Sequence, residues 1–441
     1  MMSTNQSPSP SPQLSVFGPD RVAAARAAFA DRNPRSRAAH DQARAVLPGG
    51  HTRTTLSHPP FPLTFARGAG ATLTDIDGHE YIDLLGDYTA GLLGHSERRV
   101  IDAVHAALGE IASAGAIHGH ELGLANLMCS RFGLDRVRFT NSGTEANLMA
   151  ITAAIQLTGR TKLMVFHGGY HGMVMYFATG PAPSNAPYEF VVAPYNDLAG
   201  TVQLIEQHGR SLAAVLVEPM QGAGGCLPAT AEFLNGTFAA ARSVGAVCIA
   251  DEVMTSRHGP RGLLALRGGR ADITTFGKYI GGGFSFGAFG GSAELLDQFD
   301  SNRPSYIRHG GTFSNNVATM TAGEIVLGEL YTADVAVAHT ARGDAFRARV
   351  ADVLGRHSLP VSVSGYGSML SLHAVATAPT NAHEVAARDP HLQELLFLGL
   401  YARGMYLAAR GMMCLSLPLS DAQLSAALAA LDDCLAELSA R

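Results

Sequence analysis

Lysine is almost absent from this chain, and its two occurrences differ in their surroundings. Of the 32 basic residues, only Lys162 and Lys278 are lysines. An arginine guanidinium stays protonated, whereas a desolvated lysine amine can lose its proton and attack a carbonyl carbon. Lys162 stands at the start of a predicted strand, where a solvated charge is the simpler interpretation. Lys278 lies in Ile-Thr-Thr-Phe-Gly-Lys-Tyr-Ile-Gly-Gly-Gly, whose apolar residues and glycines favour Schiff-base chemistry at its amine.

A pair of carboxylates closes one of the strongly apolar segments. Asp251 and Glu252 follow directly after residues 246–250, which predict a buried strand. In open α/β sheets, ligands gather at the carboxyl ends of the strands. A partly desolvated carboxylate at such a position is suited to hold a proton on a heteroaromatic nitrogen. The alternative interpretation is a structural carboxylate that caps a neighbouring loop.

Hydroxyl residues and a glycine open a predicted helix that follows another strand. The segment Ser-Gly-Thr-Glu-Ala-Asn occupies residues 142–147. Free N–H groups and the helix dipole make a helix N-terminus an anion site, and the hydroxyls of Ser142 and Thr144 can add donors. The alternative is an ordinary helix cap with Glu145 in the first turn.

Histidines occur in two close pairs, but neither pair predicts a metal site. His167 and His171 lie in a glycine-rich loop, which disfavours the helix that would align them, and no third ligand has matching spacing. His118 and His120 are interpreted as turn or loop residues. Tyr170, in the first of these loops, can instead stack on a flat ring.

The elements that must position these residues alternate along the middle of the chain. Short β-rich segments are separated by amphipathic stretches such as residues 145–157 and 232–244, which predicts a mostly parallel α/β sheet. Residues 284–290 predict a further strand that returns through a glycine-rich turn after Lys278. The other predicted strands are residues 137–140, 163–166, 190–193, 213–217, 246–250 and 273–276.

A length of 441 residues predicts one large domain and one smaller domain. A helix is predicted from residue 20 to about residue 47, and helical patterns at residues 342–354 and 421–438 bracket a β-rich stretch. We expect a disordered tail over residues 1–19, an N-terminal segment that joins the small domain over 20–80, a large cofactor-binding domain over 81–325 and a small α+β domain over 326–441.

Composition narrows the class of protein. Hydrophobic residues make up 47% of the chain and charged residues 16%, which is typical of a compact enzyme, and a net charge of −5 indicates neither a nucleic-acid nor a membrane-surface partner. We expect no membrane span and no signal peptide. The cysteines are scattered and odd in number, which predicts reduced core thiols and a cytoplasmic location. They are Cys129, Cys226, Cys248, Cys414 and Cys434.

Taken together, these segments resemble the class III (fold type I) aminotransferases, which depend on pyridoxal 5′-phosphate (PLP). The resemblance runs from about Val46 to Pro418 and implies a mostly parallel sheet of the seven-stranded type in the large domain, with a smaller α+β domain. The motifs that carry it begin at Asn141 (Asn-Ser-Gly-Thr-Glu-Ala), His167 (His-Gly-Gly-Tyr-His-Gly), Glu218 (Glu-Pro-Met-Gln-Gly), Asp251 (Asp-Glu-Val-Met-Thr), Gly277 (Gly-Lys-Tyr-Ile-Gly-Gly-Gly) and Gly311 (Gly-Thr-Phe).

The resemblance assigns roles to the residues that the chemistry singled out. Lys278 would hold PLP as a Schiff base and move the proton, and Asp251 would pair with the pyridinium nitrogen. Tyr170 would cover one face of the ring, and Val253 would pack on the other. Further cofactor-binding residues would be Ser142, Gly143 and Thr144 at the phosphate, together with Glu218.

Thr312 is expected to reach the phosphate site of a neighbouring subunit. The functional unit implied by the resemblance is therefore a homodimer with shared active sites. Small-molecule amino-acid and 2-oxo-acid substrates are expected, with no metal, no nucleic acid and no membrane partner.

Two subgroups of the family resemble this chain. The segment at Asp251 and Gly-Tyr-Gly-Ser-Met at residues 365–369 are similar to glutamate-1-semialdehyde aminomutase. Stretches such as Tyr-Thr-Ala-Gly at residues 88–91 are closer to the β-phenylalanine aminotransferases. The aminomutase pattern has Gly-Asn-Pro where this chain has Asn-Asn-Val at residues 315–317, and this departure favours the β-amino-acid interpretation.

Two arginines fit an enzyme that binds different carboxylates in turn. Arg53 matches the carboxylate-binding arginine of the β-phenylalanine group, and Arg410 matches an arginine on a loop that meets the α-carboxylate of the acceptor. Bidentate pairing with a carboxylate suits arginine at both positions, although either can instead form a surface ion pair. Tyr88 is expected to line the apolar side of the pocket, with ordinary core packing as the alternative.

The sequence thus predicts transfer of an amino group from a β-amino acid, such as β-phenylalanine, to 2-oxoglutarate or pyruvate by a ping-pong mechanism. An aminomutase would instead isomerise one substrate without an acceptor. A PLP-dependent racemase or epimerase would exchange the α-proton without forming an oxo product.

Overall fold

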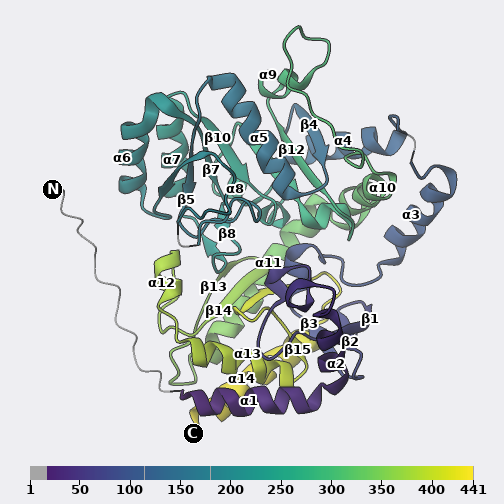
Figure 1. Cartoon of the computed structure of the whole chain (residues 1–441), viewed down its shortest axis with the longest axis vertical. Coiled ribbons are helices and arrows are strands. Elements are labelled where there is room, and N and C mark those ends of the chain that lie inside the picture. Colours follow the sequence, from purple (N-terminus) through teal and green to yellow (C-terminus); the bar gives the residue numbers. More distant parts are fainter. Residues whose placement is uncertain (1–16, 114, 179, 441) are drawn as a thin grey trace.

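The computed structural model describes residues 17–113, 115–178 and 180–440, which form two lobes (Figure 1). Residues 1–16, most of the predicted disordered tail 1–19, lie outside the described residues. The end of that prediction is wrong, because Phe17 is buried and helix α1 begins at Pro19. One lobe holds a seven-stranded sheet, and the other gathers the first helices and the C-terminal elements (Figure 1).

The large sheet is mostly parallel, as the alternating pattern predicts. Its strand order is β4-β12-β11-β10-β7-β5-β6. Within it, β12 runs antiparallel to both of its neighbours, which confirms the predicted strand that returns after Lys278. The strands are β4 (Arg136–Thr140), β5 (Lys162–Phe166), β6 (Glu189–Ala193), β7 (Leu212–Val217), β10 (Val247–Asp251), β11 (Ile273–Gly277) and β12 (Gly287–Gly291).

Helices cover both faces of this sheet, so side chains of the central strands alternate between two buried cores. In β7, Leu216 faces the core that contains α5 (Gly143–Thr158), whereas Val215 faces the core that contains α6 (Leu198–His208) and α7 (Ala231–Ser243). Every residue of β7 is therefore buried, and the strand is a continuous apolar run rather than an alternating one.

A further group of helices packs near the β4 end of the sheet. It consists of α3 (Arg98–Glu110), α4 (Gly119–Phe132) and α10 (Val317–Ile325), and its core includes Phe276 of β11. The short turn at Lys278–Gly281 also packs against α10. The backbone that carries Lys278 is thus supported by contact with α10.

The smaller lobe has a core built from both ends of the chain. Phe29 and Phe61 belong to the same buried cluster as Phe397 and Tyr401, and α1 packs against α13. Two small sheets have the orders β1-β2-β3-β15 and β13-β14-β16. The elements are α1 (Pro19–Arg32), α2 (Pro34–Ala43), β1 (Phe65–Ala69), β2 (Thr72–Asp75), β3 (Glu80–Asp83), α11 (Ala333–Leu354), β13 (Ser362–Tyr366), β14 (Met369–His373), α12 (Ala382–Ala386), α13 (Pro390–Ala402), β15 (Met405–Tyr406), β16 (Met412–Cys414) and α14 (Asp421–Ser439).

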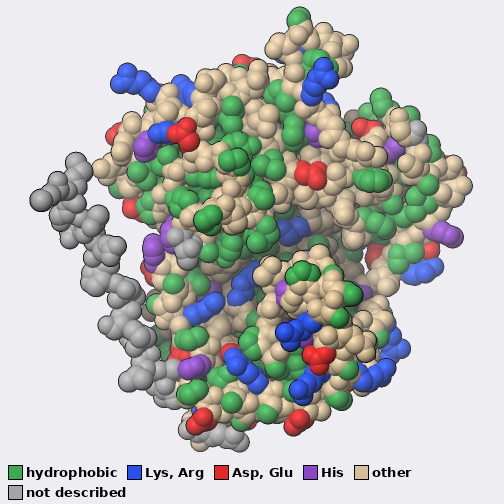
Figure 2. All heavy atoms as spheres, viewed as in Figure 1, with side chains coloured by type: hydrophobic (Ala, Val, Ile, Leu, Met, Phe, Trp, Pro, Cys, Tyr) green, Lys and Arg blue, Asp and Glu red, His purple; other side chains and the backbone are tan. Residues whose placement is uncertain are grey.

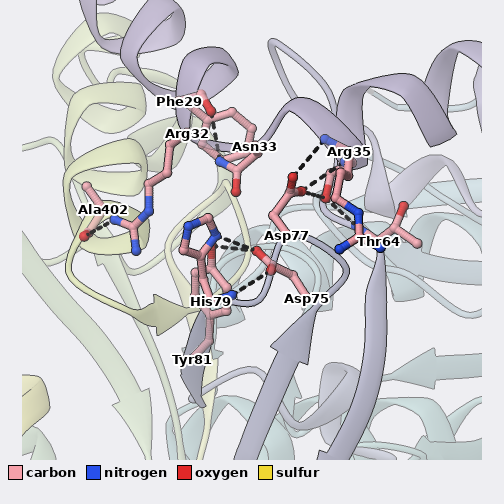
Figure 3. A network of polar contacts seen from close by, with 11 residues as sticks. Phe29, Arg32, Asn33, Arg35, Thr64, Asp75, Asp77, His79, Tyr81 and Ala402 are labelled. Atoms are coloured by element: carbon pink, nitrogen blue, oxygen red, sulfur yellow. Dashed lines mark hydrogen bonds and ion pairs between the residues drawn. The ribbon is translucent and has the colours of Figure 1, made fainter.

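The predicted single helix over residues 20–47 is wrong, because the chain forms two helices with a break at Asn33. Proline disfavours the helical conformation of the residue before it, and Asn33 has φ −122° and ψ 54°. Figure 3 shows how the second helix is anchored: Asp77 accepts hydrogen bonds from the backbone N–H groups of Arg35 and Ser36 at 2.7 and 2.9 Å. The N-terminus of α2 is therefore capped by the β2–β3 turn. In the described part of the chain, no helix is both long enough and apolar enough to cross a membrane.

Candidate active site

A cavity of about 690 Å³ lies at the carboxyl edge of the large sheet. Loops that follow β4, β5, β7, β10 and β11 all contribute to its wall, as expected for an α/β sheet whose ligands gather at this edge. The space-filling view shows the surface hollowed between the two lobes, with basic side chains in the hollow (Figure 2). The wall contains Asn141, Ser142, Gly143, Thr144, Tyr170, Glu218, Asp251, Val253 and Lys278.

Lys278 stands directly after β11 with its side chain on the cavity. Its backbone has φ 53°, a left-handed conformation that is uncommon for a residue with a side chain. Burial lowers the pKa of its amine, and the negative charges of Asp251 and Glu218 act in the opposite direction. A lowered pKa increases the fraction of neutral amine, the form that attacks a carbonyl carbon.

Asp251 is held by three donors at the end of β10. Its Oδ2 accepts hydrogen bonds from Asn147 Nδ2 and from His171 Nδ1, each at 2.8 Å, and its Oδ1 accepts the backbone N–H of Val253 at 3.0 Å. Asn147 is itself fixed, because its Oδ1 accepts a hydrogen bond from Thr275 Oγ1 at 2.7 Å. Asp251 therefore has a fixed orientation on the cavity wall.

The N-terminus of α5 combines the two interpretations that the sequence left open. Ser142 Oγ accepts the backbone N–H of Glu145 at 3.2 Å, so Ser142 is the helix cap. Gly143 and Thr144 form the first turn beside the cavity, where backbone N–H groups lack intrahelical partners. A Cβ atom at Gly143 would lie 2.7 Å from Val253 Cγ2. Glycine is thus required for this turn to approach the segment after β10.

Glu218 holds the loop that carries Tyr170. Its Oε1 accepts the backbone N–H of Tyr170 at 2.8 Å, and its Oε2 accepts that of Gly222 at 3.1 Å. Burial raises the pKa of Glu218, and the neighbouring His171 opposes this shift. Tyr170 lies on the cavity wall with its ring edge-on to Tyr176, 5.4 Å between centroids. Glu218 thus helps to hold Tyr170 on the cavity wall by binding the backbone of its loop.

Two guanidinium groups lie near one aromatic ring outside the wall of this cavity. Arg53 and Tyr88 line a second cavity of about 390 Å³, and Arg410 lines neither of the two. The guanidinium carbon of Arg53 is 5.6 Å from the centre of the Tyr88 ring, and that of Arg410 is 4.9 Å from it. Tyr88 is 8% exposed, packs in an apolar cluster and donates a hydrogen bond from its hydroxyl to the Thr55 carbonyl at 2.7 Å. The structure thus brings together the three residues predicted to bind substrate.

The loop that carries Tyr88 has an unusual backbone. Gly86, Asp87, Tyr88 and Thr89 have φ values of 52°, 41°, 54° and 84°. Left-handed conformations cost little for glycine but are strained for the other three, and such strain is concentrated at functional sites. Asp87 lines the cavity, and its Oδ1 pairs with Arg53 Nη1 at 2.8 Å.

Thr312 is not part of this cavity wall. It is exposed, in a loop whose neighbours line a separate shallow depression of about 400 Å³. Among the predicted cofactor residues, it is the one that this chain does not bring to its own site. Its predicted role requires a second copy of the chain.

Sequence reasoning missed the residues that hold Asp251 and Arg53. Asn147 and His171 both lie in segments that the sequence marks as candidate site loops. Their hydrogen bonds to Asp251 span 104 and 80 positions of the chain, and bonds over such separations leave no local signal. Asp87 was missed because neither its turn nor its ion pair is visible in the sequence. Within the described ranges, no group of three or more possible metal ligands occurs.

Comparison with known proteins fits this geometry. Residues 54–435 match the family described as aminotransferase class III, and the chain belongs to this family. Its members are PLP-dependent enzymes of fold type I, so the predicted enzyme class and cofactor are confirmed.

Two kinds of relative within the family are similar to this chain. A β-phenylalanine transaminase of Variovorax paradoxus is 46% identical over 409 residues, covering 91% of this chain and 93% of that protein. The crystal structure of a β-phenylalanine aminotransferase from Variovorax paradoxus superposes with a TM-score of 0.94 at 44% identity, covering 96% of this chain and 98% of that one. A glutamate-1-semialdehyde 2,1-aminomutase of Deinococcus radiodurans is 37% identical, covering 85% of this chain and 90% of that protein. Both resemblances that the sequence indicated are therefore present.

Proposed function

We propose that this protein transfers the amino group of a β-amino acid with an apolar or aromatic side chain, such as β-phenylalanine, to a 2-oxo acid. The observation that carries the proposal is the pair of guanidinium groups, Arg53 and Arg410, near the buried Tyr88 ring, with Arg53 joined to the Lys278 cavity through its ion pair with Asp87. A transaminase of this kind must bind an apolar group and different carboxylates in alternate half-reactions. The similarity to the β-phenylalanine transaminase of Variovorax paradoxus supports this substrate class.

The residues on the cavity wall fit PLP. Lys278 would supply the amine for covalent attachment, and the fixed carboxylate of Asp251 would pair with the ring nitrogen. Ser142, Gly143 and Thr144 at the α5 N-terminus would hold the phosphate. Tyr170 and Val253 would contact the ring. When bound, PLP supplies an electron sink for the charge that develops as a C–H bond beside the amino group breaks.

The chain itself supplies proton transfer and orientation. Lys278, with its pKa lowered by burial, accepts the proton from the substrate carbon and returns it. Asp251 keeps its position through His171 and Asn147. Arg53 binds the carboxylate of the β-amino acid, and Arg410 binds that of the 2-oxo acid. The enzyme keeps the amino group between the two half-reactions.

A homodimer is the proposed functional unit. Thr312 is exposed in one copy and is proposed to complete the phosphate site of a second copy. Exposed apolar side chains near this loop support such contact, since Ile117 is 85% exposed and Phe313 is 63% exposed. The five cysteines are free thiols, which supports a reducing compartment such as the cytoplasm.

An aminomutase is the second proposed activity, favoured by the similarity to glutamate-1-semialdehyde 2,1-aminomutases. Such an enzyme needs no amino acceptor. One experiment separates the two proposals: the PLP-loaded protein is mixed with β-phenylalanine in the absence of any acceptor, and the cofactor spectrum is recorded.

For a transaminase, we expect the amine form of the cofactor to replace the aldehyde form in the absorption spectrum. Addition of 2-oxoglutarate should then restore the absorption of the aldehyde form. An unchanged spectrum, together with conversion of glutamate-1-semialdehyde without an acceptor, would establish the aminomutase instead. Arg53→Ala and Arg410→Ala then test the substrate sites. We expect the first to raise the KM of the β-amino acid and the second to raise the KM of the 2-oxo acid.

A further inference from the structure

The two arginines near Tyr88 differ in whether they carry a counter-ion. Arg53 Nη1 lies 2.8 Å from Asp87 Oδ1. Arg410 has no carboxylate partner among the residues that the structure describes: its Nη2 contacts Met412 Sδ at 3.0 Å, and its Nε is buried without a hydrogen bond. One guanidinium is therefore neutralised from within the chain, and the other remains open to a ligand.

Hydrogen bonds hold the backbone turn that carries Asp87. Asp83 Oδ1 accepts the N–H groups of Leu85 and Gly86 at 2.8 and 2.9 Å, just before the turn. Gly91 N–H donates to the Gly86 carbonyl at 2.8 Å and closes it. The left-handed φ of 41° at Asp87 is thus imposed by the surrounding loop. A flexible surface loop would have relaxed this strain.

The Arg53–Asp87 pair is accessible to a competing ion. The two side chains are 47% and 54% exposed, so water reaches both and the pair is weak. A carboxylate that binds Arg53 must displace Asp87 or approach beside its negative charge. A small carboxylate that replaces Asp87 at Arg53 gains little binding free energy, because it exchanges one ion pair for another. A ligand that also fills the cavity gains binding free energy from its other contacts.

We propose that Asp87 is an internal competitor for the carboxylate site at Arg53 and thereby lowers the affinity of this site for every carboxylate. Only molecules that also make apolar and amine contacts then bind Arg53 at low concentration. This inference rests on the proposed role of Arg53 in binding the substrate carboxylate. Arg410, without such a competitor, accepts carboxylates more freely.

Asp87→Asn tests the proposal, because the amide oxygen can still accept a hydrogen bond from Arg53 while the charge is removed. The measurement is titration calorimetry of the PLP-loaded protein with 3-phenylpropanoate, a carboxylate that lacks the amino group. We expect the variant to bind this probe about threefold to fivefold more tightly than the natural protein. The KM for β-phenylalanine should fall by a similar factor, with kcat within about twofold.

Two control variants separate competition from other effects. Asp102→Asn removes an equal charge from a surface pair with Arg98, 2.8 Å apart, and should leave the binding of the probe unchanged. In an Arg53→Ala background, Asp87→Asn should no longer tighten binding, because the contested guanidinium is absent.

Equal or weaker binding of 3-phenylpropanoate to Asp87→Asn, or no measurable binding to either protein, would overturn the proposal. Weaker binding with a raised KM would show that Asp87 positions Arg53 instead. These binding results do not depend on turnover. Failure of the natural protein to transaminate β-phenylalanine would therefore refute the proposed function without deciding the role of Asp87.

Discussion

The guanidinium carbon of Arg410 lies 4.9 Å from the centre of the Tyr88 ring, whose hydroxyl is tied to the Thr55 carbonyl. The face of an aromatic ring attracts cations, so this contact helps to hold a guanidinium that has no carboxylate partner among the described residues. Burial together with the charge of Arg410 lowers the pKa of Arg388. The positive charges of Arg388 and Arg410 are thus close enough to repel each other.

Replacement of Lys278 is expected to abolish catalysis. Lys278→Ala removes both the point of covalent attachment and the base, so kcat should fall by about 1,000-fold or more. Reduction of the PLP-loaded natural protein with borohydride, followed by peptide mass spectrometry, should place the cofactor on the peptide that contains Lys278.

The chain offers a matched control in its second lysine. Lys162 begins β5, and no part of it lines the cavity. Lys162→Ala should retain full activity and the same labelled peptide. Label on Lys162, or repeated turnover by Lys278→Ala, would contradict the assignment.

Asp251→Asn should preserve the fold and lose most of the rate. The amide can still accept the N–H of Val253, but it carries no charge to maintain a proton on the cofactor nitrogen. We expect kcat to fall by about 100-fold or more, with an unchanged circular dichroism spectrum. His171→Ala, which removes one of three donors to Asp251, should have a smaller effect in the same direction. A rate close to that of the natural protein in Asp251→Asn would exclude the proposed role.

Gly143→Ala should weaken cofactor binding, and a second substitution should restore it. The added Cβ would lie 2.7 Å from Val253 Cγ2 and would push the α5 N-terminus away from the segment after β10. Overpacking of this kind costs about 1–3 kcal/mol, so the PLP dissociation constant should rise about tenfold. Val253→Ala added to Gly143→Ala should recover part of the loss, as measured by fluorescence titration of the apoenzyme. No recovery would show that the clash is not the cause.

Glu252 should make stability depend on pH in a defined direction. It is 2% exposed, and burial raises the pKa of its carboxyl from 4.5 to about 7. Between these values the folded state binds more protons than the unfolded state, so the free energy of unfolding falls as pH rises. The loss amounts to on the order of 3 kcal/mol across the window.

Glu252→Gln removes this titration while leaving an oxygen for the N–H of Leu264, which Glu252 accepts at 2.8 Å. The thermal midpoint of the natural protein should therefore fall relative to that of the variant between pH 5 and pH 7 (roughly the two pKa values). The test is the change of this difference in thermal midpoint with pH. The amide itself shifts the midpoint of the variant by an amount that does not depend on pH. A difference that stays constant over this range would refute the prediction.

The sequence was sufficient for the parts of the fold and site that depend on local patterns. Strong apolar runs predicted the strands of the large sheet, including β10 ahead of Asp251. The nearly lysine-free composition singled out Lys278. Ser142 was identified because a cap and an anion site share one local signature.

What could not be predicted depends on contacts between distant segments. His171 and Asn147 hold Asp251 only because β4, β5 and β10 end at the same edge of the sheet. The break at Asn33 was missed although Pro34 was visible, because helical periodicity continues on both sides of it. α13, at Pro390–Ala402, is mostly buried, so its sequence lacks the amphipathic pattern that identifies a surface helix.

The strained turn at Asp87, Tyr88 and Thr89 also bears on how this enzyme would respond to selection. Glycine adopts left-handed backbone conformations without steric cost, so selection for thermal tolerance alone would place glycine at these three positions. Such a lineage would lose the ring near the two arginines and the counter-ion of one of them. At this turn, substitutions that raise stability are therefore expected to reduce function. A screen for more thermostable variants should leave these residues unchanged.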